Sequence, residues 1–313
     1  MDCRLGDVAT THHGYAFKST GFVDQQPEMP VIVKPGMFRE SGGFNLGYGR
    51  IQCFVGDYPA RFVLTPGALV VVMTCQTQGG EILGVPARIP DDGRQYLHNQ
   101  RIGRVTCSPR LDEGFAYWLL NDWGVRGQLV QTASGSTVLH TSPSRIAECT
   151  IRLPPLEEQR RVAATLDALE DKIESNERRC ALHAEMIDAM FSHHVLERDV
   201  SNDTEADLTS IARFVNGGAF TKGATGTGRP VLRIKELNSG ISNATVFNDL
   251  DVKDEHVARH HDLLFSWSGS LDDYRWHGPE ALINQHIFKV LPRDGLPVWF
   301  VQGWIRHHLP EFR

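Results

Sequence analysis

The chain has 313 residues, of which 41% are hydrophobic and 22% are charged, a composition typical of folded globular proteins that allows two separate hydrophobic cores. No apolar run is long enough to cross a bilayer, and the N-terminal residues lack the basic-then-apolar order of a signal peptide. The six cysteines form no Cys-x-x-Cys pair, which argues against structural zinc and a disulfide framework and favours a reducing cytoplasm.

The net charge of −6 at first argues against a nucleic-acid partner. The acidic excess, however, is concentrated in residues 156–199, whereas residues 1–155 carry nearly equal numbers of basic and acidic side chains. Binding to DNA requires a local basic patch rather than a basic chain. The charge distribution is therefore compatible with a DNA-binding face on residues 1–155, but it does not by itself predict one.

Residues 1–155 predict a domain of mixed α and β structure. Short apolar runs at 62–64 and 68–73 are typical of strands, and segment 113–130 has the pattern of an amphipathic helix. Frequent Gly, Pro and Asp residues mark loops between these elements. Tyr117 and Trp118 lie at helical spacing among apolar residues, so we expect them in the core rather than stacked on a nucleic-acid base.

Two loops of this first domain carry side chains suited to DNA. Amides and guanidinium groups reach base edges, whereas hydroxyls, ammonium groups and backbone N–H groups contact phosphates. The segment that follows the strand at 68–73 offers Thr74, Gln76, Thr77 and Gln78, and the segment 14–20 offers Lys18. We predict DNA contacts at these residues, against the alternative that each is an ordinary solvated loop residue.

Residues 156–216 contain neither Gly nor Pro, and a long helix at 156–200 is predicted to begin after Pro154 and Pro155. Apolar residues recur there at alternating spacings of three and four, the pattern of a coiled-coil seam. The alternative is an amphipathic helix that lies on its own domain, but a helix of this length outgrows such a domain. The residues expected to pair with another helix are Val162, Leu166, Leu169, Ile173, Asn176, Ile187 and Met190.

The two ends of the chain resemble each other. Residues 5–9 align with 208–212, and the same spacing aligns 14–17 with 217–220. Further on, 99–105 matches 284–290, and an aromatic segment follows each copy. We interpret the chain as a domain, a spacer helix and a second domain that lacks equivalents of the final strand and of the long helix.

The sequence of the second domain predicts loops and an amphipathic helix at 297–309. By comparison with the first domain, Lys222, Ser268 and Arg275 are its candidate DNA contacts. The repeated pairs Asn99-Gln100 and Asn284-Gln285 are more typical of structural residues, because two domains that read different sequences need different recognition residues. Side-chain bonds from these pairs to the loop backbone would explain their repetition.

We find no catalytic signature. The chain has no phosphate-binding P-loop and no Asn-Pro-Pro-aromatic run of the amino-methyltransferases. His256 and His260 are spaced like metal ligands on a helix, but Glu255 precedes the pair instead of lying within it as a zinc protease requires. We therefore expect surface histidines and no metal site.

The residues carry a resemblance to one family. The run Leu153-Pro154-Pro155-Leu156-Glu157-Glu158-Gln159, followed by the seamed helix, resembles the proximal spacer of the specificity subunits of type I restriction-modification systems. Residues 262–270 and 282–290 are similar to the target-recognition domain of that family. The resemblance covers nearly the whole chain.

The resemblance implies an α+β fold with two target-recognition domains, the second incomplete, at 1–155 and 201–313, separated by a coiled-coil spacer helix at 156–200. It implies double-stranded DNA as the ligand, methyltransferase subunits and motor-nuclease subunits as partners, and no catalysis by this chain. S-adenosylmethionine, ATP and Mg²⁺ would belong to the partner subunits, which methylate adenine and cleave DNA at a bipartite site.

Two alternatives remain open. In the first, the chain is a half-subunit that forms a homodimer through residues 156–196 and recognises a palindromic split site, or that inhibits by competing for partners. In the second, it is a coiled-coil scaffold whose end domains bind protein or carbohydrate. The scaffold predicts binding that does not depend on DNA sequence.

Overall fold

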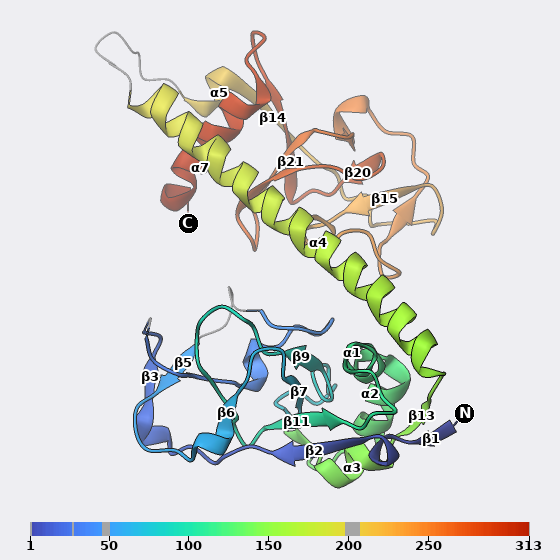
Figure 1. Cartoon of the computed structure of the whole chain (residues 1–313). Coiled ribbons are helices and arrows are strands. Elements are labelled where there is room, and N and C mark those ends of the chain that lie inside the picture. Colours follow the sequence, from blue (N-terminus) through green and yellow to red (C-terminus); the bar gives the residue numbers. More distant parts are fainter. Residues whose placement is uncertain (1, 27, 46–50, 198–206, 313) are drawn as a thin grey trace. The chain divides into compact units, whose positions relative to one another are not determined.

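The computed structural model describes residues 2–26, 28–45, 51–197 and 207–312 (Figure 1). The chain divides into two compact units, Met1–Ser175 and Asn176–Arg313. The long helix α4, Leu156–Phe191, contributes residues to both units and passes into one π-helical segment, Ser192–Leu196. The predicted domain boundary at residue 200 lies outside the described residues.

Unit 1 contains the first thirteen strands and the first three helices. The strands are β1 (Asp2–Arg4), β2 (Ala9–His13), β3 (Phe22–Asp24), β4 (Val31–Ile32), β5 (Gln52–Phe54), β6 (Val63–Leu64), β7 (Leu69–Val72), β8 (Thr74–Cys75), β9 (Pro86–Arg88), β10 (Tyr96–Leu97), β11 (Ile102–Cys107), β12 (Leu139–His140) and β13 (Thr150–Arg152). The helices are α1 (Glu113–Asn121), α2 (Trp123–Gln131) and α3 (Pro143–Glu148). Its two larger sheets have the strand orders β2-β11-β7-β9 and β3-β5-β4-β10-β6.

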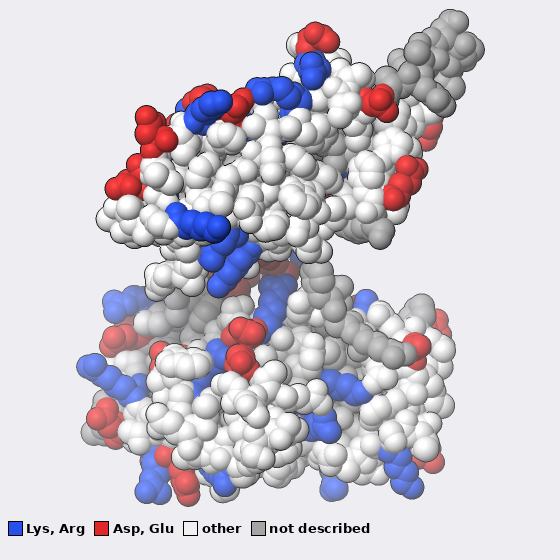
Figure 2. Space-filling model, turned by 180° about the vertical axis from the view of Figure 1, so that it is seen from behind, with Lys and Arg blue, Asp and Glu red and all other residues white. Residues whose placement is uncertain are grey.

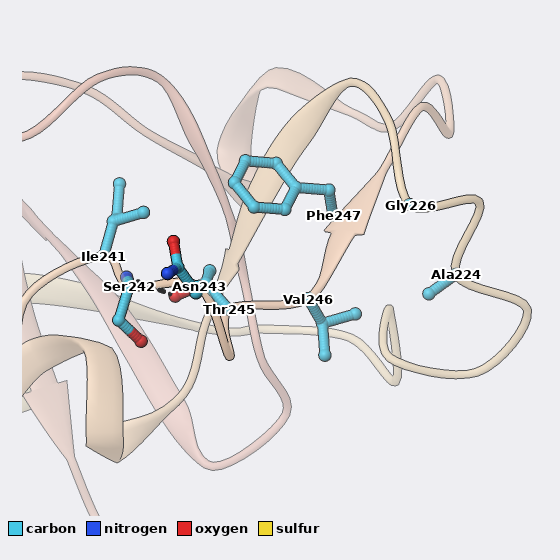
Figure 3. A pocket seen from close by; sticks show the side chains of 8 residues that line it. All are labelled: Ala224, Gly226, Ile241, Ser242, Asn243, Thr245, Val246 and Phe247. Atoms are coloured by element: carbon cyan, nitrogen blue, oxygen red, sulfur yellow. Dashed lines mark hydrogen bonds between the residues drawn. The ribbon is translucent and has the colours of Figure 1, made fainter.

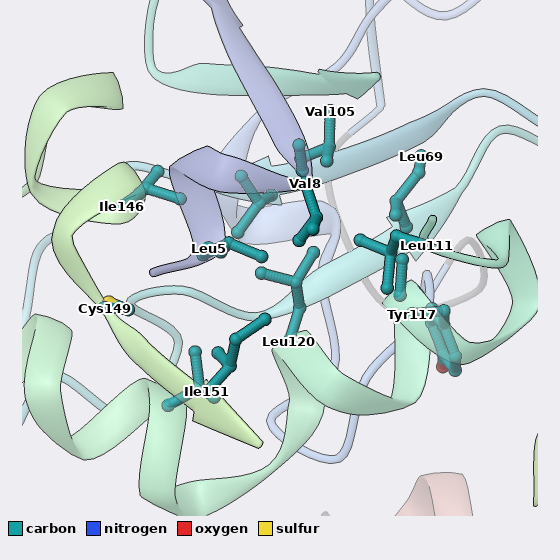
Figure 4. Packing of buried hydrophobic residues seen from close by; sticks show 14 of the residues in the cluster. Leu5, Val8, Leu69, Val105, Leu111, Tyr117, Leu120, Ile146, Cys149 and Ile151 are labelled. Atoms are coloured by element: carbon teal, nitrogen blue, oxygen red, sulfur yellow. The ribbon is translucent and has the colours of Figure 1, made fainter. Parts of the chain in front are cut away.

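Strand β7 is buried on both faces and joins the two hydrophobic clusters of unit 1. Successive strand side chains point to opposite faces, so Leu69 and Val71 pack with the helices while Val70 and Val72 pack with the second sheet. Figure 4 shows the helical side of this core, where Leu69 lies near Leu111. A continuous apolar run in the sequence thus becomes the central strand of the unit.

The segment predicted as one helix at 113–130 is two helices. Asp122 has an extended backbone and caps α2, because its carboxylate accepts a hydrogen bond from the N–H of Gly124 at 2.8 Å. Asp112 caps α1 in the same way through the N–H of Phe115. The prediction of helix there is confirmed, but its continuity is wrong because a second capping residue interrupts it.

Unit 2 repeats the plan of unit 1. Its strands are β14 (Ala212–Asn216), β15 (Arg229–Leu232), β16 (Phe247–Asn248), β17 (Val257–Ala258), β18 (Leu263–Ser266), β19 (Asp272–Arg275), β20 (Ala281–Ile283) and β21 (Ile287–Pro292). Its other helices are α5 (Leu208–Ile211), α6 (Ile234–Ser239) and α7 (Val298–Phe312). The sheet orders β14-β21-β18-β19 and β16-β15-β20-β17 parallel those of unit 1.

Matched strands also pack alike, which confirms the internal repeat. Strand β18 occupies the place of β7: Leu263 and Phe265 pack with helix α7, whereas Leu264 packs with the second sheet. Each unit has one parallel strand pair, β4 with β10 and β15 with β20.

None of the described helices combines the length and apolar character that spanning a membrane requires.

Candidate functional site

In unit 1, antiparallel pairing brings three loops to one edge of a sheet. His13, at the end of β2, pairs with Gly103 at the start of β11, and Val72, at the end of β7, pairs with Ile102 beside it. The loops that leave β2 and β7 and the turn that enters β11 therefore meet at this edge. We define the first loop edge as residues 14–18, 76–78 and 100–101.

Unit 2 has an equivalent edge. Asn216 pairs with Phe288, and Ser266 pairs with Ile287, so the same three connections meet. The indole N–H of Trp267 donates to the side-chain oxygen of Asn216 at 3.2 Å, which ties two of the loops together. We define the second loop edge as residues 217–222, 267–270 and 285–286.

A glycine lets the chain approach the turn closely at each edge. A Cβ added at Gly14 would lie 2.1 Å from the carbonyl oxygen of Asn99, and one added at Gly217 would lie 2.2 Å from that of Asn284. Parallel bridges join Tyr15 to Asn99 and Gly218 to Asn284 at these points. These glycines are repeated in the sequence because any side chain would separate the loops.

The repeated Asn-Gln pairs divide into two roles. Asn99 and Asn284 are buried, and the side chain of Asn99 accepts a hydrogen bond from the N–H of Arg101 at 3.0 Å. The structural interpretation is thus confirmed for Asn99, and the burial of Asn284 agrees with it. Gln100 and Gln285 are instead exposed on the loop edges, so the pairs contain exposed amides that the sequence interpretation set aside.

The predicted residues of the 74–78 segment also differ among themselves. Gln76, Thr77 and Gln78 are exposed. Thr74 is buried in strand β8, and its hydroxyl is bonded to Nδ1 of His140 at 3.0 Å. The prediction of Thr74 as a loop residue is wrong, because it lies in a strand that pairs with β12 and its side chain is buried.

Lys18, Lys222 and Ser268 lie in matched connections. Lys18 follows β2, Lys222 follows β14, and both side chains are exposed. Ser268 is half-buried in the 267–271 loop after β18, the counterpart of the loop that carries Gln76. The structure thus assigns these three residues to the two loop edges.

Arg275 does not lie on the second loop edge. It ends strand β19 and pairs with Leu263 at the start of β18, about 10 Å along the strand from the loop. Its Nη1 atom is buried without a hydrogen-bond partner, and burial lowers the pKa of its guanidinium. The prediction of a loop position for Arg275 is wrong because strand register, which the sequence does not reveal, decides the edge.

Sequence reasoning missed several exposed residues of the edges. Arg101, Gln285 and His286 flank the buried asparagines, and Trp267 is 42% exposed. For Arg101, Gln285 and His286, the available signal was their position within two residues of the repeated asparagines. Figure 2 shows basic and acidic residues interspersed on one face of each unit, with broad areas that carry neither.

The base of helix α4 is fixed to unit 1 by polar contacts. The buried amide of Gln159 accepts from the N–H of Asp112 at 2.9 Å and donates to the carbonyls of Arg110 and Pro154. One turn further, Ala163 is buried in the core of the unit. The predicted seam therefore begins inside the domain.

Two carboxylates of α4 bind the aromatic helix α1. Asp167 accepts from the indole N–H of Trp118 at 2.8 Å and pairs with Arg88 at 3.0 Å. Glu170 accepts from the hydroxyl of Tyr117 at 2.9 Å. Tyr117 is 2% exposed, so its predicted core role is confirmed, and burial with the nearby Glu170 raises the pKa of its hydroxyl.

The other end of α4 packs against helix α7 of unit 2. Phe191 is buried with its ring 5.5 Å from that of Trp304. Asp188 pairs with Arg306 at 2.9 Å, and Arg306 also binds the buried carboxylate of Asp273. Both ends of α4 are thus anchored within their own units.

Between these anchors the predicted seam faces solvent. Ile173 is 60%, Leu169 57%, Met190 53% and Ile187 39% exposed. Asn176 is exposed, whereas Val162 and Leu166 are half-buried. Leu182 and Met186, which the predicted pairing residues did not include, add two more exposed apolar side chains to the helix.

A pocket in unit 2 has a volume of about 710 Å³ (Figure 3). Ala224 and Gly226 come from the loop after β14, and Val246 and Phe247 lie across from them. Its lining includes hydroxyl and amide groups but no ionisable side chain. The pocket therefore offers no acid, base or charged anchor.

Buried titratable groups elsewhere are held in inactive forms. Burial raises the pKa of the Cys107 and Cys149 thiols to about 11, so both stay protonated near neutral pH. Burial lowers the pKa of His98 to about 4, and its neutral ring donates from Nε2 to the carbonyl of Ile102 at 2.8 Å. These groups support packing rather than reaction chemistry.

Comparison with known proteins shows where the similarity lies. Residues 88–181 match the family described as the type I restriction modification DNA specificity domain. The chain is 27% identical over 141 residues to the type I restriction enzyme MjaVIII specificity subunit of Methanocaldococcus jannaschii. That alignment covers 42% of this chain and 32% of the relative, so the match spans about a third of the relative's length.

The fold is similar to a solved structure of the S subunit of a type I restriction-modification system from M. genitalium. The TM-score is 0.62 at 16% identity, with coverage of 100% of this chain and 78% of the other. The family match and the sequence relative, together with this fold, confirm the resemblance to type I specificity subunits that the sequence indicates. The α+β fold, with two units of mixed structure and a long helix, is confirmed with it.

Proposed function

We propose that the chain is the DNA-sequence-recognition subunit of a type I restriction-modification complex and directs adenine methylation and restriction to a bipartite site. The observation that carries this proposal is the match of residues 88–181 to the DNA specificity domain. The matched residues include the turn of the first loop edge and the first part of helix α4.

Each loop edge offers groups of the kind that read DNA. Gln76, Gln78 and Gln100 present amides beside the guanidinium of Arg101, all exposed on unit 1. Amide and guanidinium groups form paired hydrogen bonds with adenine and guanine in the major groove. Lys18 and Thr77 are suited to phosphate contacts beside them.

The second edge presents a different set. Gln285 supplies an exposed amide, Lys222 an ammonium group and Ser268 a hydroxyl. Because the two edges share their backbone plan but differ in side chains, each unit would recognise its own half of a split site.

The chain itself would be non-catalytic. Methyltransferase subunits would supply S-adenosylmethionine chemistry, and motor-nuclease subunits would supply ATP- and Mg²⁺-dependent cleavage, in the cytoplasm. The first turns of α4 lie beside a pocket of about 480 Å³ lined by Leu153, Pro154 and Pro155, which offers an apolar recess for a partner subunit.

A second candidate function is favoured by the exposed seam of α4. Four apolar residues of the predicted seam, each more than a third exposed, offer a surface for another helix. Two chains that pair through residues 156–196 would present their first loop edges symmetrically and recognise a palindromic split site. Alternatively, such a chain would compete for partner subunits.

Long-read sequencing of adenine methylation tests both functions, in cells that express the chain with its neighbouring methyltransferase subunit. A split asymmetric motif supports the bipartite proposal, and a palindromic motif supports the dimer. The absence of new methylation, with both subunits in solution, contradicts recognition for methylation.

Loop variants link the motif to the structure. The double variant Gln76→Ala/Gln78→Ala should reduce methylation at the motif by at least tenfold, since each paired base contact contributes about 1–3 kcal/mol of discrimination. Gln131→Ala, an exposed glutamine at the end of α2, is the matched control and should leave methylation unchanged. Equal methylation by the double variant and the control would show that the 76–78 loop does not take part in recognition.

A further inference from the structure

Three imidazoles gather at the end of the β18–β19 hairpin that lies opposite its 267–271 loop. His260 and His261 precede β18 and His277 follows β19, and one ligating nitrogen from each lies within 4.8 Å of the others. The ring centroids are 4.0 Å apart for His260 and His261, and 5.3 Å apart for each of these with His277. Among residues 2–26, 28–45, 51–197 and 207–312, this is the one group of three potential metal ligands so close together.

The backbone holds this arrangement in an uncommon conformation. His261 has a φ of 71°, in the left-handed region that residues other than glycine rarely adopt. Its N–H donates to the carbonyl of Trp276 at 2.7 Å, which fixes the turn against the segment after β19. Consecutive side chains of an extended strand point to opposite faces. The left-handed residue instead allows both histidines to reach His277.

A hydrogen bond from the ring of His260 leaves its other nitrogen available to bind a metal ion. Its Nδ1 lies 3.1 Å from the carbonyl oxygen of His277, and a carbonyl only accepts, so Nδ1 carries the proton. In the neutral ring Nε2 then has a free lone pair. A ligating histidine ordinarily donates its other N–H to a carbonyl or carboxylate, which orients the ring in this way.

The surrounding charges leave the imidazoles without a carboxylate partner in the described part of the chain. Arg259 is held by Asp254 and Glu280, and Asp262 is held by Lys289 at 2.7 Å.

We propose that His260, His261 and His277 form a binding site for a divalent transition-metal ion of the zinc class, with the fourth position open to water. Zinc–nitrogen bonds of about 2.0–2.1 Å in a tetrahedral site place the nitrogens about 3.4 Å apart. Rotation of exposed side chains closes the present separation. The ion would fasten the turn before β18 to the segment after β19, and the site is independent of the proposed function.

The test is calorimetric titration of zinc into the full chain, prepared without a polyhistidine tag. We expect one equivalent to bind at least tenfold more tightly than the remaining sites. The variant His260→Gln/His261→Asn/His277→Gln should lose this equivalent; asparagine at 261 tolerates the left-handed backbone. Cobalt should show the visible spectrum of a tetrahedral site in the parent chain and not in this triple variant.

His193→Gln/His194→Gln is the matched control, because these exposed rings lie 4.9 Å apart as a pair. The control should retain the tight equivalent, and circular dichroism should show that all three proteins have the same secondary structure. The proposal is overturned by a parent chain without a tight equivalent, by a triple variant that keeps it, or by a control that loses it.

Discussion

Gln159 should determine how firmly helix α4 is seated on unit 1. The side chain is 1% exposed and makes three hydrogen bonds, one to the N–H of Asp112 and two to the carbonyls of Arg110 and Pro154. Gln159→Ala leaves these three backbone groups without their partner. Each buried unsatisfied group costs about 1–3 kcal/mol.

Water moderates this cost, since Gln159 also lines the pocket of about 480 Å³ beside Pro154. We therefore expect unit 1 to lose about 2–4 kcal/mol rather than the full sum. This loss corresponds to a roughly 30- to 1000-fold increase in hydrogen exchange at amides that exchange through unfolding of the unit.

The assay is native-state hydrogen exchange by mass spectrometry of the full chain, followed in peptides from α1 and the first turns of α4. Gln128→Ala is the matched control, because Gln128 also makes three hydrogen bonds to backbone groups but is only half-buried, so that water replaces them. Its cost should stay below about 1 kcal/mol. Equal protection in the two variants would refute the reasoning.

Three further predictions concern other parts of the chain. The pKa of His98 is about 4 in the folded state and 6.5 ordinarily, so the unfolded chain takes up the proton first. Unit 1 should therefore lose about 3 kcal/mol as pH falls from 6.5 to 4, and urea unfolding of His98→Gln should lack this dependence. Leu169→Glu/Ile173→Glu should keep the parent's circular dichroism but sediment as a monomer at concentrations where the parent is dimeric; unchanged sedimentation would exclude pairing through these residues. In Gly303→Val, a Cβ at 2.2 Å from the ring of Phe191 should displace that ring and cost about 1–3 kcal/mol, and an unchanged melting temperature would contradict the packing of α4 on α7.

The long helix was predictable because its signals are local. The absence of Gly and Pro, the proline pair at 154–155 and the apolar seam all act within a few turns, and the observed helix runs from Leu156 to Phe191. The anchoring of its ends was not predictable. Whether Ala163 or Phe191 faces a domain core depends on contacts with residues far away in the sequence.

Two wrong predictions, one in the fold and one at the candidate site, have a similar origin. Asp122 was an available capping residue inside the segment 113–130, and recognising it requires knowledge of the backbone at one position. Arg275 and Ser268 are seven residues apart in sequence, yet the β18–β19 register sends them to opposite ends of a hairpin. Register depends on tertiary packing, and no spacing rule encodes it.

The repeat also shows how the surface that we propose for recognition can vary without loss of the fold. The close approach at each loop edge involves Gly14 or Gly217 against Asn99 or Asn284, where a larger residue would force the loops apart. The neighbouring exposed positions have no such constraint. The residue that follows the repeated glutamine is Arg101 in unit 1 and His286 in unit 2. Buried and crowded positions therefore carry the similarity between units, and exposed positions beside them carry the difference. Under the proposed function, this division would suit a chain that recognises two distinct half-sites, and it would place specificity at the exposed neighbours of repeated residues rather than at the repeated residues themselves.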